Sequence, residues 1–321
     1  MLKDTFGRRF HYLRLSITDV CNFRCTYCLP DGYQGSDRSF LTSSEIHTVA
    51  RAFAGLGTSK IRITGGEPSL RKDLPHIIEK CASTPGIEHV AMTTNAFRLE
   101  RDVGVWHKAG LQSLNISIDS FDPHMFHSIT GHNSLDSILR GIEKACELDM
   151  KVKINAVLMK QYNGNDMSRF LRWVKDKPVT LRFIELMQTG DNASFFKQNH
   201  VSGEPIKQQL LEAGWGQLIR DKAAGPAQEF QHPDYAGKIG LIMPYSKDFC
   251  ASCNRLRITA LGKLHLCLFS EAGIDLRQYM QNDDHHALQD ALVSHLSTKK
   301  ATHLLHEGNT GATQHLAMLG G

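Results

Sequence analysis

Short runs of β-branched and other apolar residues alternate along the chain with longer amphipathic segments. The strand-like runs span residues 13–18, 60–64, 88–94, 112–118, 151–158 and 180–186. Apolar positions with helical spacing fall between them, near residues 42–56, 73–82, 99–109, 134–149 and 166–176. A helix between successive strands returns the chain to the same end of the sheet. The pattern therefore predicts an α/β fold built on a parallel sheet.

Chemically distinctive residues directly follow four of these predicted strands. Cys21 comes after the first strand, Gly65 and Gly66 after the second, Asn95 after the third and Asp119 after the fourth. Ligands of parallel sheets bind beyond the carboxyl ends of the strands, so these residues are expected to share one functional edge. No GxGxxG motif follows the first strand, which favours a curved sheet over a flat nucleotide-binding one.

The composition excludes several classes of protein. With 321 residues, of which 41% are hydrophobic, the chain can form one large domain or a large domain with a smaller partner. Lys and Arg total 37 and Asp and Glu total 33, which gives a net charge of +4 without the basic stripe of a nucleic-acid-binding protein. No apolar run reaches the length of a membrane-spanning helix. We therefore expect neither nucleic acid nor membrane as a partner.

Three of the eight cysteines, Cys21, Cys25 and Cys28, lie in the run CNFRCTYC. Three thiolates at CxxxCxxC spacing can hold three irons of a four-iron cluster and leave the fourth iron open to a small molecule. The alternative is a structural zinc site, which needs a fourth ligand and is usually closed by a second close pair. The spacing favours the cluster. Because exposed clusters need a reducing setting, it also favours a cytoplasmic location.

A second group of cysteines lies near the other end of the chain. Cys250 and Cys253 form a CxxC pair in the run DFCASCNRLR, and Cys267 follows after thirteen residues. This group also has three thiols and no evident fourth ligand. The remaining Cys81 and Cys146 fall in helix-like segments, where we expect buried and inert thiols.

The first cysteine motif, with the aromatic Tyr27 before its last cysteine, resembles the radical S-adenosylmethionine superfamily. The resemblance implies an open (β/α)6 partial TIM-type barrel and a cofactor chelated by the open iron, whose cleavage gives a 5′-deoxyadenosyl radical. It also implies cofactor contacts at Tyr27, Gly66, Ser117 and Met187. From the residues alone, Gly66 is equally a tight turn after a strand, Ser117 an ordinary strand serine, and Met187 a core residue.

The motifs CNFRCTYC, RITGGEP, TTN, SIDS, KINAVLM, RFIELM and CNRLR together resemble the GTP 3′,8-cyclase family of molybdenum-cofactor biosynthesis. The resemblance implies two [4Fe–4S] clusters, held by the two cysteine groups, and S-adenosylmethionine. The implied reaction is the radical conversion of GTP to (8S)-3′,8-cyclo-7,8-dihydroguanosine 5′-triphosphate, a lyase activity. The implied domains are a radical core over residues 5–222 and a C-terminal region over residues 223–321 that carries the second cluster and closes the barrel mouth.

A triphosphate needs several cations, with arginine favoured for forked contacts. The family resemblance implies GTP contacts at Arg14, Arg62, Thr93, Lys153, Arg255, Leu256 and Arg257, and catalytic roles for Arg255, Arg257 and the terminal Gly320 and Gly321. Taken singly, Arg14, Arg62 and Lys153 are ordinary strand-end charges. Directed into one barrel mouth, however, they would repel one another without an anion.

The family resemblance also implies partners beyond GTP. These are a reducing donor such as flavodoxin or ferredoxin, and cyclic pyranopterin monophosphate synthase as the next enzyme, with the chain a monomer or a homodimer. Two other functions remain open: a peptide-modifying radical enzyme with an auxiliary cluster, and a non-enzymatic zinc-binding module. One residue departs from the family pattern, because Ala96 stands where TTNG is usual. If that position has a positive φ, Ala96 costs about 1 kcal/mol.

Overall fold

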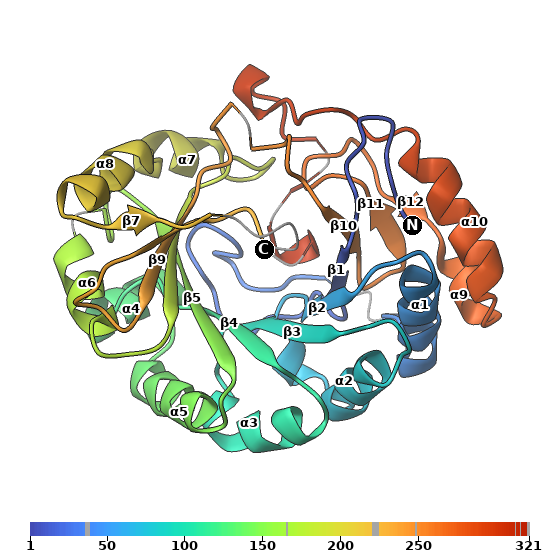
Figure 1. Cartoon of the computed structure of the whole chain (residues 1–321), viewed down its shortest axis with the longest axis horizontal. Coiled ribbons are helices and arrows are strands. Elements are labelled where there is room, and N and C mark those ends of the chain that lie inside the picture. The colour runs from blue at the N-terminus through green and yellow to red at the C-terminus, as the bar shows by residue number, and fades with distance from the viewer. Residues whose placement is uncertain are drawn as a thin grey trace.

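The computed structural model describes residues 1–35, 39–164, 166–219, 225–247, 249–311, 313–314 and 316–319. Its described strands form one sheet in the order β12-β11-β10-β1-β2-β3-β4-β5-β6-β9-β8-β7. The sheet curves around a central space and does not close, since β12 and β7 are its two edges (Figure 1). No helix in the described ranges is long and apolar enough to cross a membrane.

The six strands predicted from the sequence form the middle of this sheet, and each pairs in parallel with the next. They are β1 (Tyr12–Ser16), β2 (Lys60–Thr64), β3 (His89–Thr94), β4 (Ser113–Ser117), β5 (Lys151–Leu158) and β6 (Thr180–Glu185). Leu13 and Ile61 face the helices and are fully buried in the apolar core. Because side chains alternate along a strand, their neighbours Arg14 and Arg62 face the other side, toward the barrel interior.

The C-terminal part of the chain extends the sheet at both edges. β9 (Lys238–Ile242) pairs in parallel with β6, and β10 (Arg255–Ile258) pairs in parallel with β1. Antiparallel strands then continue each edge, β8 (Gln228–Gln231) and β7 (Gly216–Gln217) on one side, and β11 (Lys263–His265) and β12 (Ile274–Asp275) on the other. The predicted domain boundary between residues 222 and 223 lies outside the described residues.

Helices cover the outer face of the curved sheet (Figure 1). The five predicted helices are confirmed as α1 (Ser43–Gly55), α2 (Leu74–Ala82), α3 (Leu99–Lys108), α5 (Leu135–Glu147) and α6 (Met167–Val174). The sequence analysis missed α4 (Pro123–Thr130), whose start is encoded locally: the Asp122 side chain accepts a hydrogen bond from the Met125 amide at 2.9 Å. The remaining helices are α7 (Ala193–Asn199), α8 (Glu204–Glu212), α9 (Arg277–Gln281) and α10 (His285–Leu296), with 3-10 turns η1 (Pro68–Leu70), η2 (Leu305–Glu307) and η3 (Leu316–Leu319).

The two cysteines outside the predicted metal groups lie on outer helices. Cys81 on α2 is fully buried, as predicted. Cys146 on α5 is only half-buried, so the prediction of a buried thiol is wrong for this residue. The reason is that Cys146 lies at the edge of the helix face that packs on the sheet.

Candidate active site

The first cysteine group lies in the loop that follows β1. Cys21, Cys25 and Cys28 are each partly buried, and the Cys28 amide donates a hydrogen bond to the Cys25 carbonyl at 2.9 Å. Burial raises the pKa of Cys21 to about 11 and that of Cys28 to about 12. Burial also raises the pKa of Cys25, with further contributions from the charges of Asp119 and the other two thiols. Three thiolates at this position therefore need positive charge beside them.

This requirement fits a four-iron cluster. Within the described ranges, no three or more His, Cys, Asp or Glu side chains are arranged so that they could hold one metal ion together. A four-iron cluster would be bound through separate irons, so its three thiolates would not need to converge on one point. Its irons would also supply the positive charge that these buried thiolates lack.

The glycines of the TGGEP turn lie against the backbone of the first cysteine loop. A Cβ on Gly65, whose φ is +156°, would lie 2.3 Å from the Thr18 carbonyl oxygen, and a Cβ on Gly66 would lie 2.4 Å from the Val20 carbonyl oxygen. The Gly66 amide donates to the Thr18 carbonyl at 2.8 Å. Only glycine permits this approach, so the turn after β2 holds the loop that carries the cysteines.

Glu67, the next residue of the same turn, was not identified from the sequence as a site residue. Its carboxylate is fully buried and accepts hydrogen bonds from the Ser69 amide at 2.9 Å, the Thr94 hydroxyl at 2.8 Å and the Asn95 amide at 2.7 Å. Burial raises the pKa of Glu67, whereas these donors lower it. Glu67 therefore joins the carboxyl ends of β2 and β3. An acidic residue within the TGGEP motif, directly after a buried strand, could have identified Glu67 from the sequence.

The residues predicted to contact S-adenosylmethionine lie at the same edge of the sheet. The Tyr27 hydroxyl donates to Asp119 Oδ2 at 3.0 Å, and burial raises the pKa of Asp119 to about 6. Met187, Tyr27 and Cys28 all pack against the same small apolar cluster, which consists of Leu268, Leu316 and Leu319. Ser117 is half-buried at the end of β4. Tyr27 and Met187 are thus brought together beside the first cysteine group, with Gly66 behind its loop.

The second cysteine group lies next to β10 and shares a cavity with Arg14 of β1. Cys250, Cys253 and Cys267 line a cavity of about 100 Å³ together with Arg255 and Arg257. Burial alone would raise the pKa of Cys253, but Arg255 and Lys299 lower it to about 7. Three thiols beside several cations fit a second cluster, because the thiolate form that binds iron is favoured here.

A row of arginines crosses the interior next to this second group, in which Arg14 and Arg62 are partly buried and Arg257 is buried. Strand register places Arg62 of β2 beside Arg14 of β1, and Arg14 beside Arg257 of β10. Burial and mutual repulsion lower the pKa of Arg14 well below its usual value and also lower that of Arg62. The Nε–H groups of Arg62, Arg255 and Arg257 are buried without a hydrogen-bond partner in the part of the chain described. Guanidinium groups placed side by side in this way suit an anion with several charges.

Two further cations of this interior were missed by the sequence analysis. Lys60 lies two residues before Arg62 on β2, and burial with the charge of Arg62 lowers its pKa to about 8. Arg182 of β6 is buried, its pKa is lowered to about 9 by burial and by Arg62, and its Nε donates to Asn155 Oδ1 at 3.0 Å. Both side chains lie on the same face of the sheet as the predicted cations. The alternation of side chains along each strand could therefore have identified them from the sequence.

The other predicted GTP contacts have different surroundings. Lys153 of β5 forms an ion pair with Glu229 of β8 at 2.9 Å. The Thr93 hydroxyl is buried without a hydrogen-bond partner among the described residues. The Leu256 side chain is buried in the apolar core, so only its backbone can face a nucleotide. Gly320 and Gly321 lie outside the described residues.

Comparison with known proteins agrees with this geometry. The chain matches the Radical SAM superfamily over residues 15–174 and Molybdenum Cofactor Synthesis C over residues 179–305. The GTP 3′,8-cyclase of Vibrio parahaemolyticus serotype O3:K6 is 56% identical over 324 residues, which cover 99% of this chain and 97% of that protein. The GTP 3′,8-cyclase of Yersinia pestis is 56% identical and covers 100% of this chain and 99% of its own length.

The solved structure of Streptococcus suis SuiB bound to S-adenosylmethionine has a similar fold, with a TM-score of 0.64 at 13% identity, over 91% of this chain and 68% of SuiB. SuiB bound to its precursor peptide SuiA gives a TM-score of 0.59 at 13% identity, over 97% of this chain and 76% of that chain. At such identity the likeness concerns the fold alone, and it confirms the open partial barrel predicted from the sequence. Together with the relatives above, it leads to one conclusion: this chain belongs to the GTP 3′,8-cyclase family of radical S-adenosylmethionine enzymes.

Proposed function

We propose that this chain converts GTP to (8S)-3′,8-cyclo-7,8-dihydroguanosine 5′-triphosphate in molybdenum-cofactor biosynthesis. The observation that carries the proposal is the row of Arg62, Arg14 and Arg257 in the barrel interior, beside the second cysteine group. A triphosphate would place several negative charges beside these guanidinium groups, and its forked oxygens suit guanidinium donors. The 56% identity with GTP 3′,8-cyclases over nearly the whole chain supports the same substrate.

The cofactors are two [4Fe–4S] clusters and S-adenosylmethionine. When bound, the first cluster and S-adenosylmethionine supply a carbon radical that can abstract hydrogen from the ribose. Residues of the chain do the rest: Tyr27, Gly66, Ser117 and Met187 position S-adenosylmethionine. The nucleotide is held by Arg14, Arg62, Thr93, Lys153, Arg255, Leu256 and Arg257. A buried, curved interior excludes water and so protects a radical that would react with any nearby hydrogen.

The proposal extends to domains and partners. The radical core would comprise residues 5–222, and residues 223–321 would carry the second cluster. Each cleavage of S-adenosylmethionine consumes one electron, so a flavodoxin or ferredoxin is the expected donor. The cyclic triphosphate would pass to cyclic pyranopterin monophosphate synthase.

The test is anaerobic reconstitution of the full chain with iron and sulfide, followed by iron analysis and assay of 5′-deoxyadenosine with and without GTP. We expect about eight irons per chain, from two four-iron clusters, and cleavage that GTP stimulates. Cleavage indifferent to GTP would overturn the substrate assignment while preserving the radical chemistry.

Two cysteine variants separate the roles of the clusters. Cys25→Ala is expected to abolish cleavage of S-adenosylmethionine. Cys253→Ala is expected to retain some cleavage and to form no cyclic product. Full product from the Cys253→Ala variant would rule out a substrate-binding second cluster.

Deletion of Gly320 and Gly321 tests the proposed catalytic tail. Side-chain-free residues can enter a narrow channel, so the truncated chain is expected to keep both clusters and to lose cyclase turnover. Unchanged turnover would reject a catalytic role for the double glycine.

A further inference from the structure

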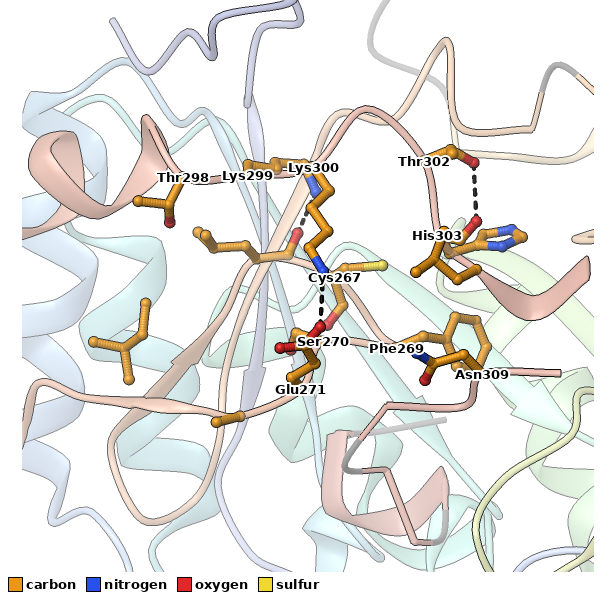
Figure 2. Close-up of a pocket in the computed structure, with 14 residues that line it drawn as sticks. Cys267, Phe269, Ser270, Glu271, Thr298, Lys299, Lys300, Thr302, His303 and Asn309 are labelled. Carbon is orange, nitrogen blue, oxygen red and sulfur yellow. Dashed lines mark hydrogen bonds and ion pairs between the residues drawn. The ribbon is translucent and has the colours of Figure 1, made fainter. Parts of the chain in front are cut away.

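Lys299 is a buried cation beside the second cysteine group that the proposed function does not use. It lies in the segment after α10 and is 5% exposed. Its ammonium donates a hydrogen bond to the carbonyl of Leu266, the residue that precedes Cys267, and lies 5.6 Å from the centre of the Phe10 ring. Figure 2 shows Lys299 and Cys267 in the wall of the same pocket, whose volume is about 280 Å³.

The backbone around Lys299 is fixed by a second cation from the N-terminus. Arg8 donates to the carbonyls of Lys300 at 2.7 Å, Ala301 at 2.6 Å and Cys250 at 3.2 Å. The segment that carries Lys299 is therefore held against the loop of the second cysteine group. The charge of Arg8 itself is matched by Asp4, with which it forms an ion pair at 2.6 Å.

Unlike Arg8, Lys299 forms no ion pair with a carboxylate of the described residues. The carboxylate in this pocket, Glu271, pairs with the neighbouring Lys300 at 2.8 Å (Figure 2). Burial lowers the pKa of Lys299, and the charges of Arg8 and Arg257 lower it further, whereas Cys253 and Cys267 act in the opposite direction and favour the ammonium form. A buried ammonium is stable only beside compensating negative charge. Here that charge comes from ligands of the proposed second cluster.

Lys299 approaches these ligands from a different side than the arginines do. Arg14, Arg255 and Arg257 line the inner cavity with the three cysteines, whereas Lys299 lines the outer pocket. Cys267, Phe269 and His303 line both and so form the wall between them. A bound triphosphate would neutralise the inner arginines and leave the charge of Lys299 directed at the cluster.

We propose that Lys299 is a positioning residue of the second cluster, whose buried positive charge raises the reduction potential of that cluster from the side opposite the substrate. The proposal rests on the second cluster of the proposed function. Reduction adds one negative charge to a cluster that already carries three thiolates. A fixed cation in a medium of low dielectric stabilises the reduced form more than the oxidised form.

The experiment is a redox titration, followed by electron paramagnetic resonance, of the second cluster in the full-length chain. The Cys21→Ala, Cys25→Ala and Cys28→Ala substitutions remove the signal of the first cluster. In this background we compare Lys299→Gln, which keeps a hydrogen-bond donor without the charge, with Lys299→Arg, which keeps the charge. Lys300→Met is the matched control, because it removes the neighbouring charge from an exposed ion pair.

We expect a more negative midpoint potential for Lys299→Gln, and potentials near that of the parent for Lys299→Arg and Lys300→Met. Loss of the cluster from Lys299→Gln but not from Lys299→Arg would support the same requirement for charge. An unchanged potential in Lys299→Gln would overturn the inference, as would an equal shift in Lys300→Met or loss of the cluster from both Lys299 variants. Failure of the parent chain to bind a second cluster would instead refute the proposed function.

Discussion

At the scale of single residues, the ion pair between Lys153 and Glu229 offers a test of the proposed contact between Lys153 and GTP. The pair is 2.9 Å long, and both side chains are about one-third exposed, at 33% and 28%. A triphosphate that binds Lys153 must replace Glu229 or tolerate its negative charge. Exposed pairs contribute up to about 1 kcal/mol, so Glu229→Gln is expected to lower the KM for GTP by up to about fivefold, with little change in kcat.

Initial rates of 5′-deoxyadenosine formation at varied GTP would measure this effect. Glu143→Gln is the matched control, because it removes the same charge from a surface pair with Lys177 at 3.7 Å. A higher KM in Glu229→Gln would mean that the carboxylate orients Lys153 for the nucleotide and does not compete with it.

Ala96 tests a different balance, between backbone strain and burial. Its φ is +62° and it is 1% exposed, so the structure confirms the positive φ considered from the sequence. Relief of the left-handed conformation gives about 1–2 kcal/mol, and loss of a buried methyl costs about 0.8 kcal/mol. Ala96→Gly is therefore expected to raise the free energy of unfolding by up to about 1 kcal/mol in urea titrations, and the β-branched Ala96→Val to lower it. Destabilisation by glycine would show that the methyl group outweighs the strain.

At the scale of elements, a capping box links the start of α1 to the C-terminal region. The Thr42 hydroxyl accepts from the Glu45 amide at 3.2 Å, and Glu45 accepts from the Thr42 amide at 2.7 Å and from Arg277 Nε at 2.9 Å. Burial alone would raise the pKa of Glu45, but the hydrogen bonds from Arg277 and Thr42 together lower it. Thr42→Ala is expected to cost about 1 kcal/mol of stability at neutral pH.

The lowered pKa also fixes the pH dependence of this contact. A depressed carboxyl pKa stabilises the fold above the unfolded value, about 4.3 for glutamate, and this stabilisation is lost as the pH falls through the lower folded value. The stability difference between the parent and Glu45→Gln is therefore expected to be full at pH 7 and to shrink below about pH 4.3. Urea unfolding at several pH values measures it, and a difference independent of pH would place the carboxylate outside the cap.

The elements also show what sequence patterns can and cannot predict. β1 to β6 were predicted because each has a local apolar run with a helix after it. The pairing of β10 with β1 and of β9 with β6 joins segments far apart in the chain, and no local periodicity encodes such a partner. For the same reason Arg255 and Arg257 were predicted only by family resemblance. Once β10 is known to be a strand, alternation places Leu256 in the core between them.

At the scale of the whole molecule, the site exists only when both ends of the chain meet. The arginine row takes Arg14 and Arg62 from the N-terminal strands and Arg257 from the C-terminal region. Lys60 and Arg182 were missed because a charged residue in a strand is usually solvated, and only the curvature of the sheet turns them into a shared interior. The gathering of like charges in one interior is thus a property of the whole curved sheet, and no single strand displays it.

The C-terminal segment makes a second such link, at the first cysteine group. Leu316 and Leu319 of η3 are buried against Tyr27, Cys28 and Met187, and amides of Leu316 and Ala317 lower the pKa of the Cys28 thiol against the raising effect of burial. Amides directed at a thiolate stabilise it and exclude solvent from a cluster bound there. Removal of residues 316–321 is therefore expected to make the first cluster markedly more sensitive to oxygen.

Loss of iron and of visible absorbance in air, followed over time in the Cys253→Ala background, measures this sensitivity for the first cluster alone. The chain lacking only Gly320 and Gly321 is the matched control, because it retains η3 and is expected to lose iron at the parental rate. Equal rates for the longer truncation and the parent would show that η3 does not protect the cluster. Faster loss in both truncated chains would assign the protection to the terminal glycines, because they are the residues that both chains lack.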